Sequence, residues 1–124
     1  MNQHDRVVLT LPAKSEFART ARLAAADLAA RVGMSVDGID DMKMAVEEAF
    51  VFVTDRRVGE TVTFDFRLDD GIELFVGPME GSCADQGSET GERYARFILE
   101  SVCDEFALVD VEDGCVVRLV KRLA

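Results

Sequence analysis

The apolar residues of this chain follow two different spacings, and each spacing predicts one kind of element. From residue 17 to residue 32, and again from Ile39 to Val53, they recur every three or four positions, which indicates two consecutive amphipathic helices. Gly33 is expected to end the first of them. A third helix is predicted from Arg93 to Cys103. Its inner face is predicted to hold Tyr94, Phe97, Ile98, Ser101 and Val102.

Strands are predicted where the apolar spacing falls to two. From Thr61 to Leu68 every second residue is apolar, which is the pattern of a strand with one buried face. Asp69-Asp70-Gly71 then predicts a hairpin turn into a returning strand at 72–76. The glycine-rich stretch 77–91 is predicted to be a loop. Three further strands are predicted, at Val7–Leu11, Phe106–Val111 and Cys115–Val120.

The predicted order of elements is β-α-α-β-β-α-β-β, which indicates an α+β protein. Helices that are segregated from hairpin-paired strands pack against them as a two-layer α/β sandwich. A chain of 124 residues can bury one hydrophobic core, so a single domain spanning residues 1–124 is expected.

Charge narrows the range of partners. The chain carries 24 acidic and 14 basic residues, which gives a net charge of −10. A negatively charged protein repels the phosphate backbone of nucleic acids, so no nucleic-acid binding is expected. The negative charge either favours a basic protein partner or serves only to keep the protein soluble. No apolar run is long enough to span a membrane, and the N-terminus lacks the pattern of a signal peptide. A cytoplasmic protein that does not bind membranes is therefore expected.

The cysteines and the histidine give little sign of a metal or disulfide site. Cys83, Cys103 and Cys115 are odd in number and widely spaced, which is not the pattern of a disulfide framework, and no C-x-x-C motif is present. They are expected to be buried or incidental thiols. His4 is the only histidine, so a histidine-based metal cluster is excluded and no metal site is predicted.

Four segments carry a family resemblance. They are LPAKSEF at 11–17, DDMKMAVEEA at 40–49, FILESVCDEF at 97–106 and VVRLVK at 116–121. In this order they resemble the anti-sigma factor serine kinases, a branch of the histidine-kinase-like (GHKL) ATPase superfamily. The family writes its second helix as D-[LM]-K-x-A-V-x-E-A-x-x-N. The resemblance implies a histidine-kinase-like ATPase fold along nearly the whole chain.

The resemblance gives a role to two positions of that second helix. Glu48 stands where the family's glutamate orders the attacking water or hydroxyl, so it is the candidate catalytic residue if the protein is active. Phe52 stands where the family has the asparagine that holds Mg²⁺. A phenyl ring offers no oxygen to a cation that demands oxygen ligands. We interpret Phe52 as a core or pocket-filling aromatic.

The other nucleotide motifs of the family are altered as well. In the D-x-G box, anchored here on Gly81, Met79 replaces the aspartate that binds the adenine amino group. The family's glycine-rich box lets backbone N–H groups approach the phosphates. Its positions hold Arg93, Tyr94, Ala95 and Arg96 here, and Gly91 remains slightly upstream. Phe52, Met79, Gly81 and Gly91 are thus degenerate nucleotide-site positions, and no cofactor is expected.

Three functional hypotheses follow. The first is an anti-sigma-factor-like regulator, a pseudokinase that binds a sigma factor or an anti-sigma antagonist without binding ATP, and that forms a homodimer as family members do. The second is a divergent ATP-dependent serine/threonine kinase of an anti-sigma antagonist. It would use Glu48 as base, with Glu80 or Asp85 as substitute ligands for ATP and Mg²⁺. The third is a redox or small-molecule sensor built on the predicted loop 77–91 and Cys83.

Overall fold

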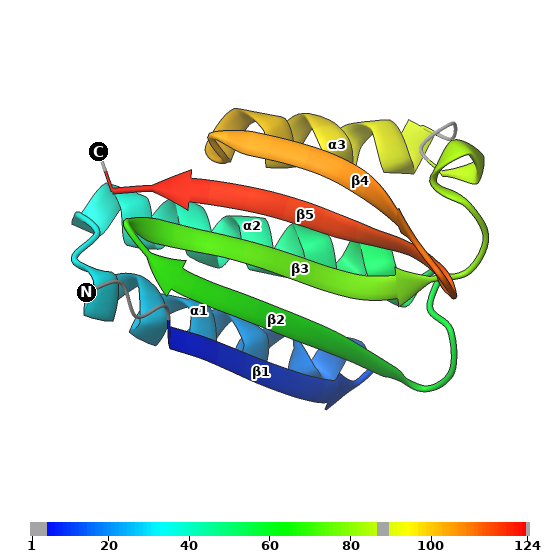
Figure 1. The fold of residues 1–124 in the computed structure, drawn as a ribbon, viewed down its shortest axis with the longest axis horizontal. Helices are drawn as coiled ribbons and strands as arrows, with labels where there is room; N and C mark the ends of the chain where they lie inside the picture. The colour runs from blue at the N-terminus through cyan, green and yellow to red at the C-terminus, as the bar shows by residue number, and fades with distance from the viewer. Residues whose placement is uncertain (1–4, 87–89, 124) are drawn as a thin grey trace.

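The computed structural model describes residues 5–86 and 90–123, with the backbone alone at residues 90–92. Within these residues a five-stranded antiparallel sheet forms one layer, and three α-helices cover one of its faces (Figure 1). The strands are β1 (Asp5–Pro12), β2 (Thr61–Asp69), β3 (Gly71–Met79), β4 (Glu105–Val111) and β5 (Gly114–Arg122). The helices are α1 (Ala18–Val32), α2 (Val36–Thr54) and α3 (Thr90–Val102), with short 3₁₀ helices η1 (Ser15–Phe17) and η2 (Cys83–Asp85). This architecture confirms the predicted α+β two-layer sandwich.

The strand order in the sheet is β1-β2-β3-β5-β4, and each neighbouring pair is antiparallel. The predicted hairpin between β2 and β3 is confirmed, with Asp69 paired to Gly71 across the turn. The register of β3 against β5 shifts between Val76 and Met79. As a result Met79, the last residue of β3, pairs with Cys115 near the start of β5.

Capping residues set the end of α1 and the start of α2, and the predicted helix end at Gly33 is confirmed. Gly33 ends α1 in the left-handed conformation (φ 94°), which glycine adopts without strain, and its N–H is hydrogen-bonded to the carbonyls of Ala29 and Ala30. Ser35 begins α2 by accepting a hydrogen bond on its Oγ from the N–H of Gly38 (3.2 Å). Within the described residues, none of the helices is both long and apolar enough to cross a membrane.

The core lies between the sheet and the helices. Phe50 of α2 stacks on Phe64 of β2, with ring centroids 5.9 Å apart, and Phe64 in turn stacks on Phe66. Small residues of α1 are fully buried beside α2, which lets the two helices approach closely. These residues are Ala21, Ala25 and Ala29. Packing of α2 on both the sheet and α1 fixes the helix that carries the family's nucleotide motif.

The uncovered face of the sheet carries charged residues that pair across the strands. Arg6 of β1 donates two hydrogen bonds to the carboxylate of Asp65 on β2 (2.9 and 2.8 Å), and these bonds lower the pKa of Asp65. Arg118 of β5 donates to Glu73 on β3 (2.7 Å) and to Glu105 on β4 (3.1 Å). Cross-strand pairs of opposite charge stabilise a sheet surface that faces water.

The predicted loop at 77–91 is wrong in part. The strand β3 continues to Met79, because Met79 pairs with Cys115 after the register shift. The 3₁₀ helix η2 occupies part of the remainder, and α3 already begins at Thr90. Short-range sequence composition cannot reveal a strand extension that depends on a partner so distant along the chain.

The predicted inner face of α3 is also wrong in part. Tyr94 and Phe97 are 64% and 67% exposed, whereas Ala95 and Leu99 are buried. Residues four apart lie on the same side of a helix, so Ala95 and Leu99 form the packed side of α3. A small side chain such as Ala95 lets α3 approach α2 more closely than a tyrosine would.

Candidate functional site

One side of α2 carries Glu48 and Phe52, the two residues of this helix to which the resemblance gives a role. This α2 stripe consists of Asp41, Ala45, Glu48 and Phe52. The helix α3 runs back along α2 in contact with it (Figure 1). Lys121 of β5 connects the two helices, since its Nζ donates both to Asp41 Oδ2 (2.9 Å) and to the carbonyl of Val102 at the end of α3 (3.0 Å). The Asp41 end of the α2 stripe therefore lies close to the end of α3.

Glu48 lies half-buried in the α2 stripe. Desolvation raises its pKa above the usual range of a glutamate, and the neighbouring charge of Glu47 adds to this effect. A raised pKa is a property of many general bases, and it is equally the property of any carboxyl that apolar neighbours cover in part. The environment of Glu48 is thus compatible with a base but does not distinguish the two roles.

Phe52 is buried, with only 4% of its surface exposed, and belongs to the hydrophobic core. Arg56, one turn further along, lies over the ring with its guanidinium carbon 4.7 Å from the centroid. The same side chain donates from Nη1 to the carbonyl oxygen of Phe52 (2.9 Å). The side chain at this position has no oxygen, and the carbonyl oxygen already accepts a hydrogen bond, so the position is poorly suited to hold Mg²⁺.

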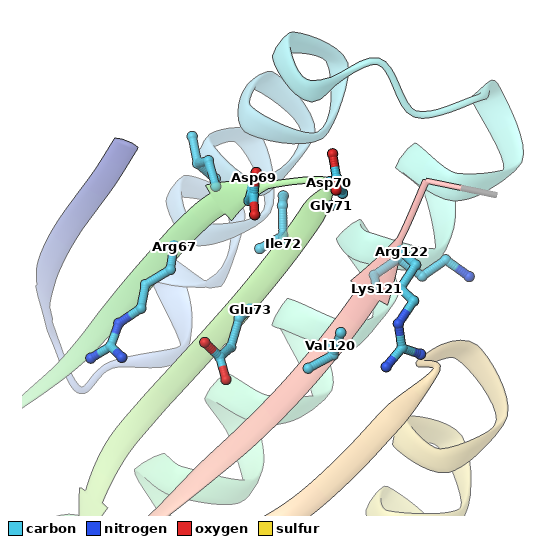
Figure 2. A pocket seen from close by; sticks show the side chains of 10 residues that line it. Arg67, Asp69, Asp70, Gly71, Ile72, Glu73, Val120, Lys121 and Arg122 are labelled. Atoms are coloured by element: carbon cyan, nitrogen blue, oxygen red, sulfur yellow. The ribbon is translucent and has the colours of Figure 1, made fainter. Parts of the chain in front are cut away.

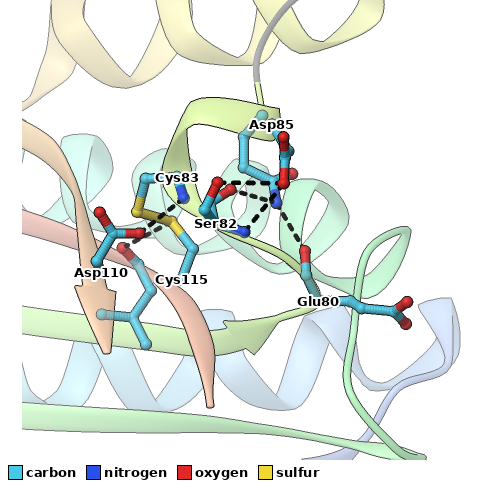
Figure 3. Close-up of a disulfide and its surroundings, with 8 residues drawn as sticks. Glu80, Ser82, Cys83, Asp85, Asp110 and Cys115 are labelled. Atoms are coloured by element: carbon cyan, nitrogen blue, oxygen red, sulfur yellow. Dashed lines mark hydrogen bonds between the residues drawn. A yellow bond between two sulfur atoms is a disulfide. The ribbon is translucent and has the colours of Figure 1, made fainter. Parts of the chain in front are cut away.

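The segment after β3 contains the altered D-x-G box. Met79 is fully buried, and Gly81 adopts a left-handed conformation (φ +84°) that glycine allows. Asp85 accepts hydrogen bonds from the N–H and the hydroxyl of Ser82 (3.2 and 3.1 Å). Glu80 is exposed, and its carboxylate points away from that of Asp85 (Figure 3). Glu80 and Asp85, the substitute ligands of the kinase hypothesis, therefore do not converge.

An open hollow lies beside this segment, at the end of α2. Its lining residues are Asp55, Arg56, Arg57, Glu80, Gly81, Asp85 and Gln86. Two arginines and three carboxylates share this hollow, so it offers no concentrated positive charge to a triphosphate. Among the described residues there is no group of three or more histidine, cysteine, aspartate or glutamate side chains that could hold a metal ion.

The positions of the family's glycine-rich box lie inside α3. An α-helix uses each N–H from its fifth residue onward for a bond to the residue four places earlier. In a helix that begins at Thr90, the N–H groups from Tyr94 onward are therefore unavailable to a phosphate. Arg96 lies over the ring of Phe106, 5.3 Å from its centroid. Gly91 falls in the first turn of α3.

A disulfide bond joins Cys83 and Cys115 beside this site (Figure 3). The two residues are 32 positions apart in the sequence, and their Cα atoms are 5.2 Å apart. The expectation of unpaired thiols is wrong for these two, because the register shift that brings β5 beside the end of β3 could not be predicted from the sequence. Cys103 stays free, and desolvation raises its pKa to about 12.

A second open hollow lies at the other end of β3, by the β2–β3 turn (Figure 2). The arginines that line it already have partners. Arg67 contacts Asp65 (3.3 Å) and the ring of Phe75, and Arg122 pairs with Glu105. The nine residues of β3 span about 30 Å at the rise of a strand, so this hollow is remote from Met79 and Gly81. It is not part of the candidate site.

Comparison with known proteins gives a consistent set of relatives. No protein-family model matches the chain. The chain is 30% identical to the serine-protein kinase RsbW of Halalkalibacterium halodurans, in a match that covers 99% of this chain and 86% of the relative. It is 46% identical over 73 residues to the RsbW of Listeria monocytogenes serotype 4a, which is 59% of this chain and 41% of that protein.

A solved structure shares the fold. The crystal structure of the RsbU and RsbW domains of a Mycobacterium tuberculosis protein matches 96% of this chain with a TM-score of 0.69 and 19% identity. The chain spans about a third of the length of that structure, 32%. At this identity the likeness shows a shared fold.

Proposed function

Because the chain belongs to the RsbW family of serine-protein kinases, we propose that it is a regulatory member that acts by binding a protein partner and does not bind ATP. The observation that carries this proposal is the burial of Phe52 at the family's Mg²⁺ position. A nucleotide triphosphate needs its metal as a counter-charge, and Mg²⁺ needs several oxygens placed together. Phe52 supplies no side-chain oxygen, and its phenyl ring stands at the position of the metal-binding side chain.

Two further features support the loss of nucleotide binding. Met79 is buried where the family has the aspartate for the adenine amino group, and a thioether is only a weak acceptor. The N–H groups of Tyr94 and the residues after it are used within α3, so they are not available to phosphates. The positions that would contact the metal, the adenine and the phosphates are therefore all altered. They lie on three different elements, α2, β3 and α3.

The proposed partner is a sigma factor or an anti-sigma antagonist, reached through a basic surface of that partner. The net charge of −10 favours association with a basic protein face. We also propose a homodimer formed on the side of β1 and α1. The strand β1 is an edge of the sheet, and Val7 and Val8 on it are 38% and 51% exposed.

The nucleotide proposal is tested by calorimetric titration of the protein with ATP and Mg²⁺, repeated with ADP. We expect no binding heat at high micromolar ligand. The H. halodurans relative serves as a positive control for the assay. The variants Phe52→Asn and Met79→Asp, made singly and together, measure how far the site has diverged. One-to-one binding by the wild-type protein would refute the proposal.

The partner proposal is tested by co-purification from a native extract with mass-spectrometric identification of bound proteins. Recovery of a sigma factor or an antagonist-type protein is expected, and a mass measurement in solution should give a dimer. An extract from which neither class of protein is recovered would count against the partner.

A second candidate function, a divergent kinase of an anti-sigma antagonist, is favoured by Glu48. This carboxyl keeps the family position, and its raised pKa suits a base that accepts a proton from a serine hydroxyl. ATP-dependent phosphate transfer to an antagonist protein that disappears in Glu48→Gln would establish this alternative. Transfer that persists in Glu48→Gln would point to a contaminating kinase.

A further inference from the structure

We propose that Cys83 and Cys115 form a reversible redox site, in which a hydroperoxide oxidises Cys83 and Cys115 then closes the disulfide. This site fastens the segment that follows β3 to the sheet (Figure 3). The inference goes beyond the proposed partner binding, and it holds whether or not a nucleotide binds. It rests on the disulfide connectivity, on the unequal burial of the two cysteine residues and on the hydrogen bonds of the segment.

The two cysteines differ in their access to solvent. Cys115 lies in β5 and is fully buried, whereas Cys83 lies in η2 and is partly exposed. A solvent-borne oxidant or reductant therefore meets the sulfur of Cys83 first. Cys103 is a poor competitor, because the thiolate is the reactive form and desolvation raises the pKa of Cys103 to about 12. This arrangement assigns the peroxide-reactive role to Cys83 and the resolving role to Cys115.

The reaction balances in two steps. With hydrogen peroxide as the oxidant, the thiolate of Cys83 attacks one peroxide oxygen, the O–O bond breaks, and Cys83 becomes a sulfenic acid, while the leaving hydroxide takes up the proton that Cys83 had lost and departs as water. Cys115 then loses its proton and attacks the Cys83 sulfur as the thiolate, the S–OH bond breaks, and the leaving hydroxide takes up that proton and departs as a second water while the disulfide forms. Two thiols lose two electrons and two protons in total, and the peroxide is reduced to water. A dithiol reductant reverses the reaction by attacking the sulfur of Cys83, the partly exposed partner of the pair.

The disulfide cross-links the 80–86 segment to β5 of the sheet. Several hydrogen bonds of this segment are internal, such as those of Asp85 with Ser82 and of Gln86 Nε2 with the carbonyl of Glu80 (2.8 Å). Two other hydrogen bonds join the segment to the rest of the protein, from the N–H of Cys83 to Asp110 Oδ1 (2.8 Å) and from the N–H of Glu80 to the carbonyl of Arg56 (2.6 Å), two residues after α2. Reduction would leave these two hydrogen bonds in place but remove the covalent link to β5.

The position of the disulfide explains why its redox state would affect the segment that follows β3. Gly81 of the altered D-x-G box lies two residues before Cys83, and α3 begins seven residues after it, at Thr90. The disulfide thus restrains the chain between β3 and the helix that covers the α2 stripe. We expect the oxidised protein to hold the 80–86 segment more rigidly than the reduced protein does.

The chemistry is tested on the full-length, fully reduced protein with stoichiometric hydrogen peroxide, by counting free thiols and by mass spectrometry. The wild type should lose two of its three thiols and two hydrogen atoms in mass, and dithiothreitol should restore all three thiols. Cys115→Ser should instead accumulate a sulfenic acid on Cys83 that dimedone captures. Cys83→Ser should form no intramolecular disulfide.

Cys103→Ser is the matched control, and it should behave as the wild type does. This background also simplifies mapping, since trypsin leaves Cys103 and Cys115 in one peptide, 97–118, and Cys83 in another, 68–93. A wild type that keeps three thiols under peroxide would overturn the proposal. So would a disulfide that folded protein never yields to dithiothreitol, because the bond would then be a permanent structural link.

The consequence for the segment is tested by amide hydrogen exchange of the oxidised and reduced wild type. Exchange at residues 80–86 should be slower in the oxidised form, while β2 should exchange equally in both forms. Equal exchange of the segment in both redox states would refute the restraint, even if the disulfide forms as proposed. Absence of any nucleotide or partner would leave both measurements unaffected.

Discussion

The two ends of the contact between α2 and α3 differ in chemistry. At the end near the start of α2, Lys121 connects Asp41 to the last residue of α3 through hydrogen bonds of 2.9 and 3.0 Å. At the end near Thr54, the buried ring of Phe52 lies beneath Arg56. The first end is a polar connection that fixes how the helices meet. At the second end an apolar side chain occupies the position where the family would bind a cation. The contacts that hold the helices together can therefore be kept while the ligand-binding residues are replaced.

Removal of the ring should have the largest effect. Phe52→Ala is expected to lower the free energy of unfolding by about 3–5 kcal/mol, because it deletes a buried aromatic side chain and leaves a cavity. Phe97→Ala removes the same side chain from α3, where it is 67% exposed, and should change stability by no more than about 0.5 kcal/mol. Urea denaturation of both variants measures the difference. Equal losses would mean that the apolar end of the contact is not a packed core.

The sequence was a good guide where a feature depends on neighbouring residues. The alternation from Thr61 to Leu68 predicts β2 because a strand exposes every second side chain, and Gly33 and Ser35 act as caps within their own helices. The α2 stripe could likewise be recognised, since its spacing repeats within one helix. The missing oxygen at Phe52 was equally predictable, because it follows from the identity of that one residue in the motif.

The features that could not be predicted depend on distant partners. Apolar and small residues occur on more than one side of α3, so Tyr94 and Phe97 compete with Ala95 and Leu99 for the inner face. Contact with α2 decides which side of α3 is buried, and the spacing of apolar residues along α3 does not reveal that contact. The disulfide likewise depends on the register between β3 and β5, and spacing along the chain says nothing about it.

Loss of the polar connection should have a moderate effect. Lys121→Met keeps the length of the side chain but leaves Asp41 and the carbonyl of Val102 without this donor, so unfolding should cost about 1–2 kcal/mol less. Lys43→Met is the control, because Lys43 pairs with Asp40 at 3.8 Å on the exposed side of α2. Such exposed pairs contribute about 0.5 kcal/mol or less. A Lys121 variant as stable as the Lys43 variant would remove the distinction between the two ends.

The smallest effect is expected at Glu48, which lies between the two ends. Its pKa is raised in the folded protein, mainly by desolvation, so its charged form opposes folding above the folded pKa. This penalty fades as the pH falls through the folded pKa, and it is absent below the unfolded pKa of about 4.3. Glu48→Gln should therefore stabilise the protein at neutral pH, within the range of about 0.5 kcal/mol usual for a surface substitution, and lose this gain near pH 3.

Chemical denaturation at the two pH values measures this gain, with Glu60→Gln as an exposed control that should show none. A neutral-pH loss of stability in Glu48→Gln would mean that the carboxylate has a favourable partner in the folded protein. A gain of stability would mean that the ionised carboxylate of Glu48 lowers the stability of the wild-type protein. A charge retained at such a cost fits a general base as well as a carboxyl that apolar neighbours cover in part, and together with ATP binding it would favour the kinase alternative. Combined with the absence of ATP binding, it would instead identify Glu48 as a remnant of the family motif in a site closed by Phe52.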